Sequence, residues 1–154
     1  EINTYSENGV YSGISKVLDY IFEYKKRSII INYPKEIKHS QRREYLRAKI
    51  NTGFELTITD VNENVEVIKG KTRDICGKGM SFFYDKPLSQ FSKYNVKIKL
   101  KGKEIVSTCQ PVYTKVVVEK GKLQFINAFV LTGITLDDIK YVVSECMNYH
   151  LKNG

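Results

Sequence analysis

From residue 48 onward, apolar and polar positions alternate along the chain with a period of two. In residues 54–58 the apolar side chains are separated by Glu and Thr, and in residues 96–100 they are separated by lysines. This alternation is typical of strands that bury one face. Turn sequences such as Lys101-Gly102-Lys103 and residues 119–122 separate the runs. The pattern predicts six or seven antiparallel strands in a small barrel or sandwich.

The period becomes helical near the C-terminus. Apolar residues recur three or four positions apart between Leu136 and Met147. Thr135 stands where an N-cap residue is expected, and Asp137 and Asp138 fall in the first turn, where acidic side chains interact favourably with the helix dipole. The sequence therefore predicts an amphipathic helix that packs against the β-structure.

The first part of the chain has a different character. Residues 1–34 contain short apolar, β-rich runs that predict two or three strands, the last of which ends at Pro34. The segment that follows, through Lys49, carries six Lys or Arg against two Glu and has few apolar residues. We therefore divide the chain into a partial N-terminal β module (1–34), an exposed basic linker (35–47) and a β domain with a terminal helix (48–154).

The charge of the chain is strongly positive. Its 154 residues include 25 Lys and Arg against 17 Asp and Glu, which gives a formal net charge of +8. A basic surface favours anionic partners, although excess charge also serves solubility alone. Three of the five arginines lie between residues 42 and 47. Because a planar guanidinium can bind phosphate or guanine through two parallel hydrogen bonds, this clustering indicates an anion-binding site.

Other features limit the classes of protein. No apolar run in the sequence reaches the roughly 20 residues of a membrane span, and three widely separated cysteines are typical of reduced thiols in the cytoplasm. His39 and His150 belong to no recognisable nucleophile or metal-binding motif, and the sequence has no glycine-rich nucleotide-binding turn. We therefore expect neither an enzyme nor a metal or a cofactor.

Two short segments hold residues suited to binding a guanine nucleotide. In the first, Arg42, Arg43 and Arg47 can converge on one multivalent anion, although two arginines four residues apart are more often simply solvated. The second is Asp74-Ile75-Cys76-Gly77-Lys78-Gly79. It combines a carboxylate that can accept hydrogen bonds from guanine with two glycines that permit a close approach of the backbone. Taken alone, it is also compatible with an ordinary hairpin turn.

Together, the two segments resemble the paired motifs of the PilZ domain, a family of bacterial receptors for cyclic di-GMP. An RxxxR motif precedes the predicted β-structure, and a DxSxxG-like motif follows about 27 positions later, with Cys76 where the family usually has Ser. The resemblance covers roughly residues 38–152. The residues before it resemble the last strands of the N-terminal domain of flagellar-brake-type PilZ proteins. The implied fold is mainly β: a small antiparallel β-barrel with a C-terminal α-helix, preceded by a short β-rich segment.

The resemblance also implies a binding site for cyclic di-GMP. Arginines of the first motif would hold guanine and phosphate from the linker side, and the second motif would line the barrel side. The implied ligand-binding residues are Arg42, Arg43, Arg47, Asp74, Cys76, Gly77 and Gly79. The thiol of Cys76 is a weaker donor and acceptor than the usual hydroxyl. Whether one or two dinucleotides bind stays open.

The leading hypothesis is a cytoplasmic, non-enzymatic receptor that rearranges its linker on binding cyclic di-GMP and so changes a protein contact. The expected partners are the dinucleotide and a downstream protein such as a flagellar motor or a polysaccharide synthase, with no DNA and no membrane span. The alternative is an adaptor that binds a protein or single-stranded nucleic acid without sensing the dinucleotide. Tyr94 and Tyr113 would then be candidate stacking residues.

Overall fold

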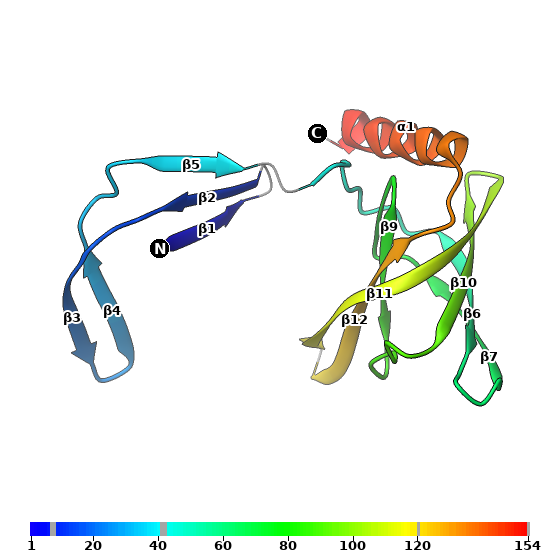
Figure 1. Ribbon diagram of the computed structural model, residues 1–154, viewed down its shortest axis with the longest axis horizontal. Coiled ribbons are helices and arrows are strands. Elements are labelled where there is room, and N and C mark those ends of the chain that lie inside the picture. The colour runs from blue at the N-terminus through cyan, green and yellow to red at the C-terminus, as the bar shows by residue number, and fades with distance from the viewer. Residues whose placement is uncertain (7–8, 41–42, 120, 154) are drawn as a thin grey trace. The chain divides into compact units, whose positions relative to one another are not determined.

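The computed structural model describes residues 1–6, 9–40, 43–119 and 121–153. The chain divides into two compact units, Glu1–Glu44 (unit 1) and Tyr45–Gly154 (unit 2). Figure 1 shows the strands and the helix of both units. Within the described residues, no helix is both long and apolar enough to cross a membrane.

Unit 1 consists of two small antiparallel sheets. Strands β1 (Ile2–Ser6), β2 (Gly9–Gly13) and β5 (Ile37–Ser40) form a sheet in the order β1-β2-β5, and β3 (Val17–Glu23) pairs with β4 (Lys26–Ile31). Four strands thus lie where the sequence predicts two or three. The position of β5 also differs from expectation, because it lies within the segment interpreted as a linker. Its side chains are all exposed and leave no hydrophobic period, while its backbone pairs with β2.

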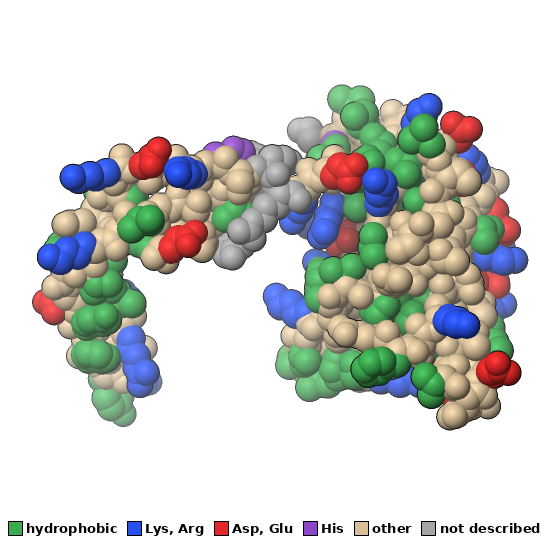
Figure 2. All heavy atoms as spheres, in the orientation of Figure 1, with side chains coloured by type: hydrophobic (Ala, Val, Ile, Leu, Met, Phe, Trp, Pro, Cys, Tyr) green, Lys and Arg blue, Asp and Glu red, His purple; other side chains and the backbone are tan. Residues whose placement is uncertain are grey.

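The β3–β4 hairpin exposes many apolar side chains. Every residue of β3 is exposed, and Tyr20 and Phe22 stack on one face with ring centroids 6.5 Å apart. Figure 2 shows apolar side chains along this hairpin. A two-stranded hairpin is at best marginally stable in water. The four described strands before residue 34 therefore contribute little buried core of their own.

Unit 2 is built on one seven-stranded antiparallel sheet in the order β7-β6-β10-β11-β12-β9-β8. Its strands are β6 (Gly53–Thr59), β7 (Val65–Lys71), β8 (Asp74–Cys76), β9 (Gly79–Tyr84), β10 (Lys93–Leu100), β11 (Lys103–Glu119) and β12 (Lys122–Leu131). The mainly β class and the expected number of strands are confirmed.

A closed barrel is not formed. Strands β7 and β8 are the two edges of the sheet, and no strand pairing joins them within the part of the chain that the structure describes. The segment before β6 makes the connection instead. Ala48 and Ile75 exchange two backbone hydrogen bonds of 2.9 and 3.0 Å, and Thr72 N donates to Thr52 O at 2.9 Å. This short segment therefore pairs with β8 and with the residue that follows β7.

The core of unit 2 follows from the alternation in the sequence. In β10 each second residue is buried, while Lys93, Lys97 and Lys99 are exposed. Phe82 lies at the centre of an aromatic group, with its ring centroid 4.6 Å from that of Phe54 and 5.8 Å from that of Phe129. Burial of one such side chain contributes roughly 1.5–3 kcal/mol to folding.

Helix α1 (Leu136–Asn153) lies across one end of the sheet (Figure 1) and buries Ile139, Val142 and Cys146. Its start is capped as the sequence predicts. The Oγ1 of Thr135 accepts a hydrogen bond from Asp138 N at 3.2 Å and donates one to the Asp138 carboxylate at 2.8 Å.

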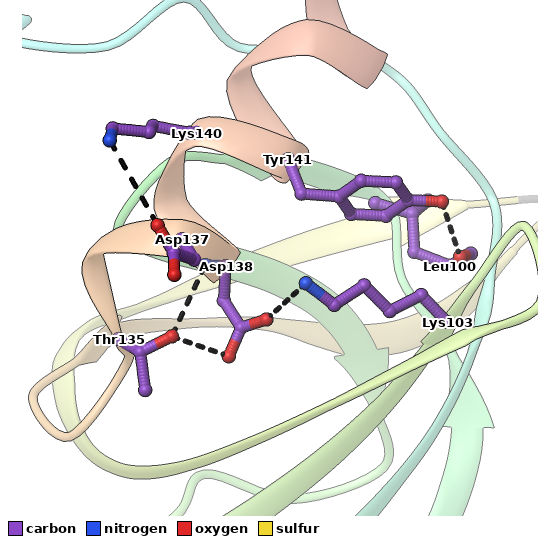
Figure 3. A network of polar contacts seen from close by, with 7 residues as sticks. All are labelled: Leu100, Lys103, Thr135, Asp137, Asp138, Lys140 and Tyr141. Carbon is purple, nitrogen blue, oxygen red and sulfur yellow. Dashed lines mark hydrogen bonds and ion pairs between the residues drawn. The ribbon is translucent and has the colours of Figure 1, made fainter.

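Two further contacts hold the start of the helix on the sheet (Figure 3). The Nζ of Lys103 lies 2.6 Å from the Asp138 carboxylate. The hydroxyl of Tyr141 donates to Leu100 O at 3.2 Å. Both partners flank the turn between β10 and β11, so the first half of α1 is fixed to that turn.

Candidate functional site

The two motifs meet at the bridge between Ala48 and Ile75. Ala48 directly follows Arg47, the last residue of the first motif, and Ile75 is the second residue of the second motif. Both bridge residues are buried, with exposed fractions of 1% and 0%. Arg47 is exposed beside the bridge, and Cys76 is half-buried on the other side of it. Unit 2 therefore positions the end of the first motif directly beside the second.

Asp74 pairs with an arginine, Arg73, that lies outside both motifs. The Nη1 of Arg73 lies 3.1 Å from the Asp74 Oδ2, and the Asp74 side chain is 18% exposed. The guanidinium carbon of Arg73 also lies 5.9 Å from the ring centroid of Phe83. A second cation, Lys49, is exposed two residues after Arg47. The carboxylate expected to meet guanine is thus already paired, and a ligand would have to share it with Arg73.

The two glycines of the second motif are required by contacts within the protein. A Cβ at Gly77 would lie 2.7 Å from Cδ1 of Tyr45 and 2.9 Å from Cγ2 of Val143. A Cβ at Gly79 would lie 3.0 Å from the carbonyl oxygen of Phe129. Neither glycine has a positive φ. The close approach that the sequence indicates is therefore made by Tyr45, helix α1 and β12.

Tyr45 packs the start of unit 2 onto this turn. Its half-buried ring lies against Gly77, and the Nζ of Lys78 is 5.3 Å from the ring centroid. Leu46, the next residue, is 47% exposed. The aromatic residue inside the first motif thus fixes the backbone from which Arg47 projects.

The last turns of α1 also contact the motifs. The Nε2 of His150 donates to the carbonyl oxygen of Arg47 at 2.7 Å, and the Sγ of Cys146 lies 3.4 Å from Ile75 O. Burial raises the pKa of the Cys146 thiol to about 11. His150 is 103 residues from Arg47 in sequence, and no local sequence pattern connects the two residues.

The first two arginines of the cluster, Arg42 and Arg43, precede unit 2 in the chain. Arg42 lies outside the described residues. Arg43 is exposed and belongs to unit 1, which ends at Glu44. Among the arginines of the first motif, Arg47 is the one that unit 2 contains.

Other chemistry is sparse in the described part of the chain. No group of three or more His, Cys, Asp or Glu there could hold a metal ion. Of the two candidate stacking residues, Tyr94 is buried and its hydroxyl donates to Ser89 O at 2.5 Å, whereas Tyr113 is 42% exposed. A stacking surface built on both tyrosines is therefore not available.

Several solved structures have a fold similar to that of this chain. The inhibitor of motility MotI/DgrA from Bacillus subtilis aligns over 94% of this chain and 68% of its own, with 17% identity and a TM-score of 0.70. The K. pneumonia MrkH–c-di-GMP complex aligns over 98% of this chain and 71% of its own, with 16% identity and a TM-score of 0.60. The PilZ domain of YcgR from Escherichia coli, solved with c-di-GMP, covers 73% of this chain at 12% identity, and 95% of that domain is matched, with a TM-score of 0.55.

Unit 2 has the PilZ-domain fold. No protein-family model matches the sequence, and no curated protein matches it. The resemblance to PilZ domains, inferred above from two short motifs, is thus confirmed at the level of fold. The alignments with MotI/DgrA and MrkH extend over unit 1 as well, because they cover 94% and 98% of the chain. In this PilZ fold, the bridge at Ala48 is what brings the first motif to the second.

Proposed function

We propose that this protein is a non-enzymatic receptor for cyclic di-GMP. The observation that carries the proposal is the Ala48–Ile75 bridge, which positions Arg47 beside the second motif. Two similar structures, MrkH and the YcgR PilZ domain, contain c-di-GMP. The three cysteines are free, which fits the reducing conditions of the cytoplasm.

The proposed site uses the motif residues in distinct ways. Arg43 and Arg47 would bind guanine and phosphate through their guanidinium groups. Asp74 would accept from a guanine base while remaining paired with Arg73, and the half-buried Cys76 would face the ligand beside Arg47. Arg42 would add a phosphate or stacking contact. Gly77 and Gly79 would act indirectly, because they permit the packing that shapes the turn.

Titration calorimetry with cyclic di-GMP tests this proposal. Arg43→Ala and Arg47→Ala should each weaken binding by roughly 1.5–3 kcal/mol, the scale of a hydrogen bond to a charged group. Arg→Lys should rescue poorly because the planar fork is lost. Arg27→Ala is the matched control, since Arg27 is an exposed arginine of β4 outside both motifs. Wild-type affinity for cyclic di-GMP in the double variant Arg43→Ala/Arg47→Ala would contradict the proposal that these arginines form the binding site.

We also propose that binding orders the segment around the first motif and thereby changes the contact with a downstream protein. Ala48 already donates to Ile75 O, and His150 donates to Arg47 O. These two contacts already fix the backbone at Arg47 and Ala48, so the residues that change conformation on binding should lie before Arg47 in the chain. Hydrogen exchange should slow in residues 43–47 when cyclic di-GMP is added, and the amides of β5, which already pairs with β2, and of Ala48 should change less. Unchanged exchange at saturation would contradict this switch.

A second candidate is an adaptor that binds nucleic acid or a protein without sensing the dinucleotide. MrkH, which aligns with a TM-score of 0.60 at 13% identity, is described as a c-di-GMP dependence transcription regulatory factor. Duplex DNA is therefore a candidate partner for this second function, although none is expected from the sequence. Titration with a short duplex DNA and a short RNA, each with and without cyclic di-GMP, separates the two functions.

A further inference from the structure

The outer face of unit 2 carries a concentrated group of lysines on three neighbouring strands. The register sets Lys97 of β10 opposite Glu55 of β6, which in turn lies opposite Lys69 of β7. One row further, Lys99 lies opposite Gly53, and Gly53 lies opposite Lys71. Residues paired in this way project from the same face of a sheet.

The floor between these lysines is open. A hollow of about 170 Å³ lies over Gly53 and Gly70, and it is lined by three lysines, one carboxylate and one aromatic residue: Lys69, Lys97, Lys99, Glu55 and Phe54. A Cβ built at Gly53 would meet no atom within 4 Å. The hollow exists because β6, the middle strand of the three, has no side chain at Gly53. Lysines of the two neighbouring strands, β7 and β10, line its sides.

The charges around the hollow are not balanced. Lys69 lies 3.4 Å from Glu55, but Lys71, Lys97 and Lys99 form no ion pair with any described residue. Glu104 is opposite Lys99 on β11, and it is the other carboxylate next to this group. Two lysines just beyond β10, by contrast, are paired: Lys101 with Glu145 and Lys103 with Asp138. Closely spaced like charges repel, so a multivalent anion in the hollow would relieve an unfavourable arrangement.

We propose that this hollow binds the phosphate groups of a small, soluble oligophosphate, such as the di- or triphosphate end of a nucleotide. Lysine binds phosphate well as a point charge. Water occupies about 30 Å³ per molecule in the liquid, so the volume admits one or two phosphate groups. Most ligand pockets for whole small molecules are larger, roughly 300–1,000 Å³. The rest of the ligand would therefore lie outside, along the exposed surface of β6 and β10.

This site is separate from the proposed cyclic di-GMP site. It uses β6, β7 and β10, whereas the two motifs lie at the Ala48–Ile75 bridge and in the turn between β8 and β9. The two sites can therefore be tested independently. A negative result for one site does not contradict the proposal for the other.

Calorimetric titration with sodium tripolyphosphate at low ionic strength is the test. Lys97→Gln and Lys99→Gln should each weaken binding roughly 5- to 20-fold, the scale of one exposed charge-assisted hydrogen bond. Lys93→Gln is the matched control, because Lys93 lies on the same face of the same strand but pairs with Thr59, outside the hollow. It should change the dissociation constant less than twofold. Cyclic di-GMP binding should be unchanged in all three variants.

Two further variants separate the hollow from general positive charge. Gly53→Leu fills the floor without changing any charge and should weaken binding at least tenfold. Glu55→Gln removes the carboxylate beside the hollow and should tighten binding about threefold. Circular dichroism verifies that each variant folds, and the lysine variants alone suffice if Gly53→Leu does not.

Equal losses in Lys93→Gln and Lys97→Gln would overturn the proposal, because they would reveal binding to net charge alone. Wild-type binding in the double variant Lys97→Gln/Lys99→Gln would overturn it as well. Vesicles that contain phosphatidic acid provide the comparison with a lipid headgroup. Binding to the vesicles without binding to tripolyphosphate would reject a soluble ligand.

Discussion

Replacement of Gly77 by alanine tests how the two motifs are held together. The added Cβ would lie 2.7 and 2.9 Å from two ring carbons of Tyr45 and 2.9 Å from Cγ2 of Val143. Carbon atoms at van der Waals contact are about 3.5–4.0 Å apart. The ring carbons concerned lie close to the Tyr45 backbone, and Val143 on helix α1 is β-branched and has one strongly preferred χ1 rotamer in a helix, so neither contact is with the far end of a flexible side chain.

The expected cost follows from these contacts. Overpacking by one methyl group in a tight site costs roughly 1–3 kcal/mol. Gly→Ala at an unstrained position returns about 0.4–1 kcal/mol through the unfolded chain. Gly77→Ala should therefore lower the free energy of unfolding by about 1–2 kcal/mol. Gly53→Ala is the control, because its Cβ would meet nothing within 4 Å and its φ is not positive. That variant should be neutral or slightly more stable.

Urea denaturation followed by circular dichroism measures both variants, and calorimetry with cyclic di-GMP measures the functional effect. Tyr45 is two residues before Arg47, so its displacement should also weaken dinucleotide binding per folded molecule. In the double variant Gly77→Ala/Tyr45→Ala, the added methyl group should cost at least about 0.5 kcal/mol less than in the wild-type background. Equal stability of Gly77→Ala and Gly53→Ala would refute this account of the turn.

Three further predictions concern the helix and the thiols. The pKa of Asp138 is lowered from its ordinary value of 3.8 by hydrogen bonds from Lys103 and Thr135. The ionised carboxylate therefore stabilises the folded protein fully above pH 3.8, and this contribution is lost as the pH falls through the lower pKa of the folded state. Asp138→Asn should thus cost about 1 kcal/mol at pH 7 in urea denaturation, with the difference disappearing in acid. Burial raises the pKa of Cys109 to about 12 and that of Cys146 to about 11, so an aromatic disulfide reagent at pH 8 should modify the half-buried Cys76 quickly and the other two thiols only on unfolding. Cys76→Ser should keep or tighten cyclic di-GMP binding by up to about 1 kcal/mol, and a lower melting temperature with unchanged affinity would instead assign Cys76 a structural role.

The sequence alone determined the features that depend on neighbours along the chain. Alternation in residues 54–58 and 96–100 predicted β6 and β10, because burial of one face of a strand requires a period of two. Thr135 and the acidic residues after it predicted the start of α1, because capping uses the adjacent backbone. The paired motifs indicated the PilZ fold, since their residue types and spacing are specific in combination.

Only the tertiary structure revealed the contacts between residues that are far apart in the sequence. The resemblance to PilZ domains indicated that the two motifs form one site, but no pattern in the sequence reveals the Ala48–Ile75 bridge or the contact of His150 with Arg47, because both arise only when distant segments pack together. The open edges β7 and β8 are likewise set by pairing, and alternation alone does not reveal whether a sheet closes. A glycine at position 77 could make room for a ligand or for a neighbouring side chain, and the sequence does not distinguish these two reasons. The packing shows that the neighbour is Tyr45. The lysines around Gly53 come from strands far apart in sequence, and strand register places them on one face.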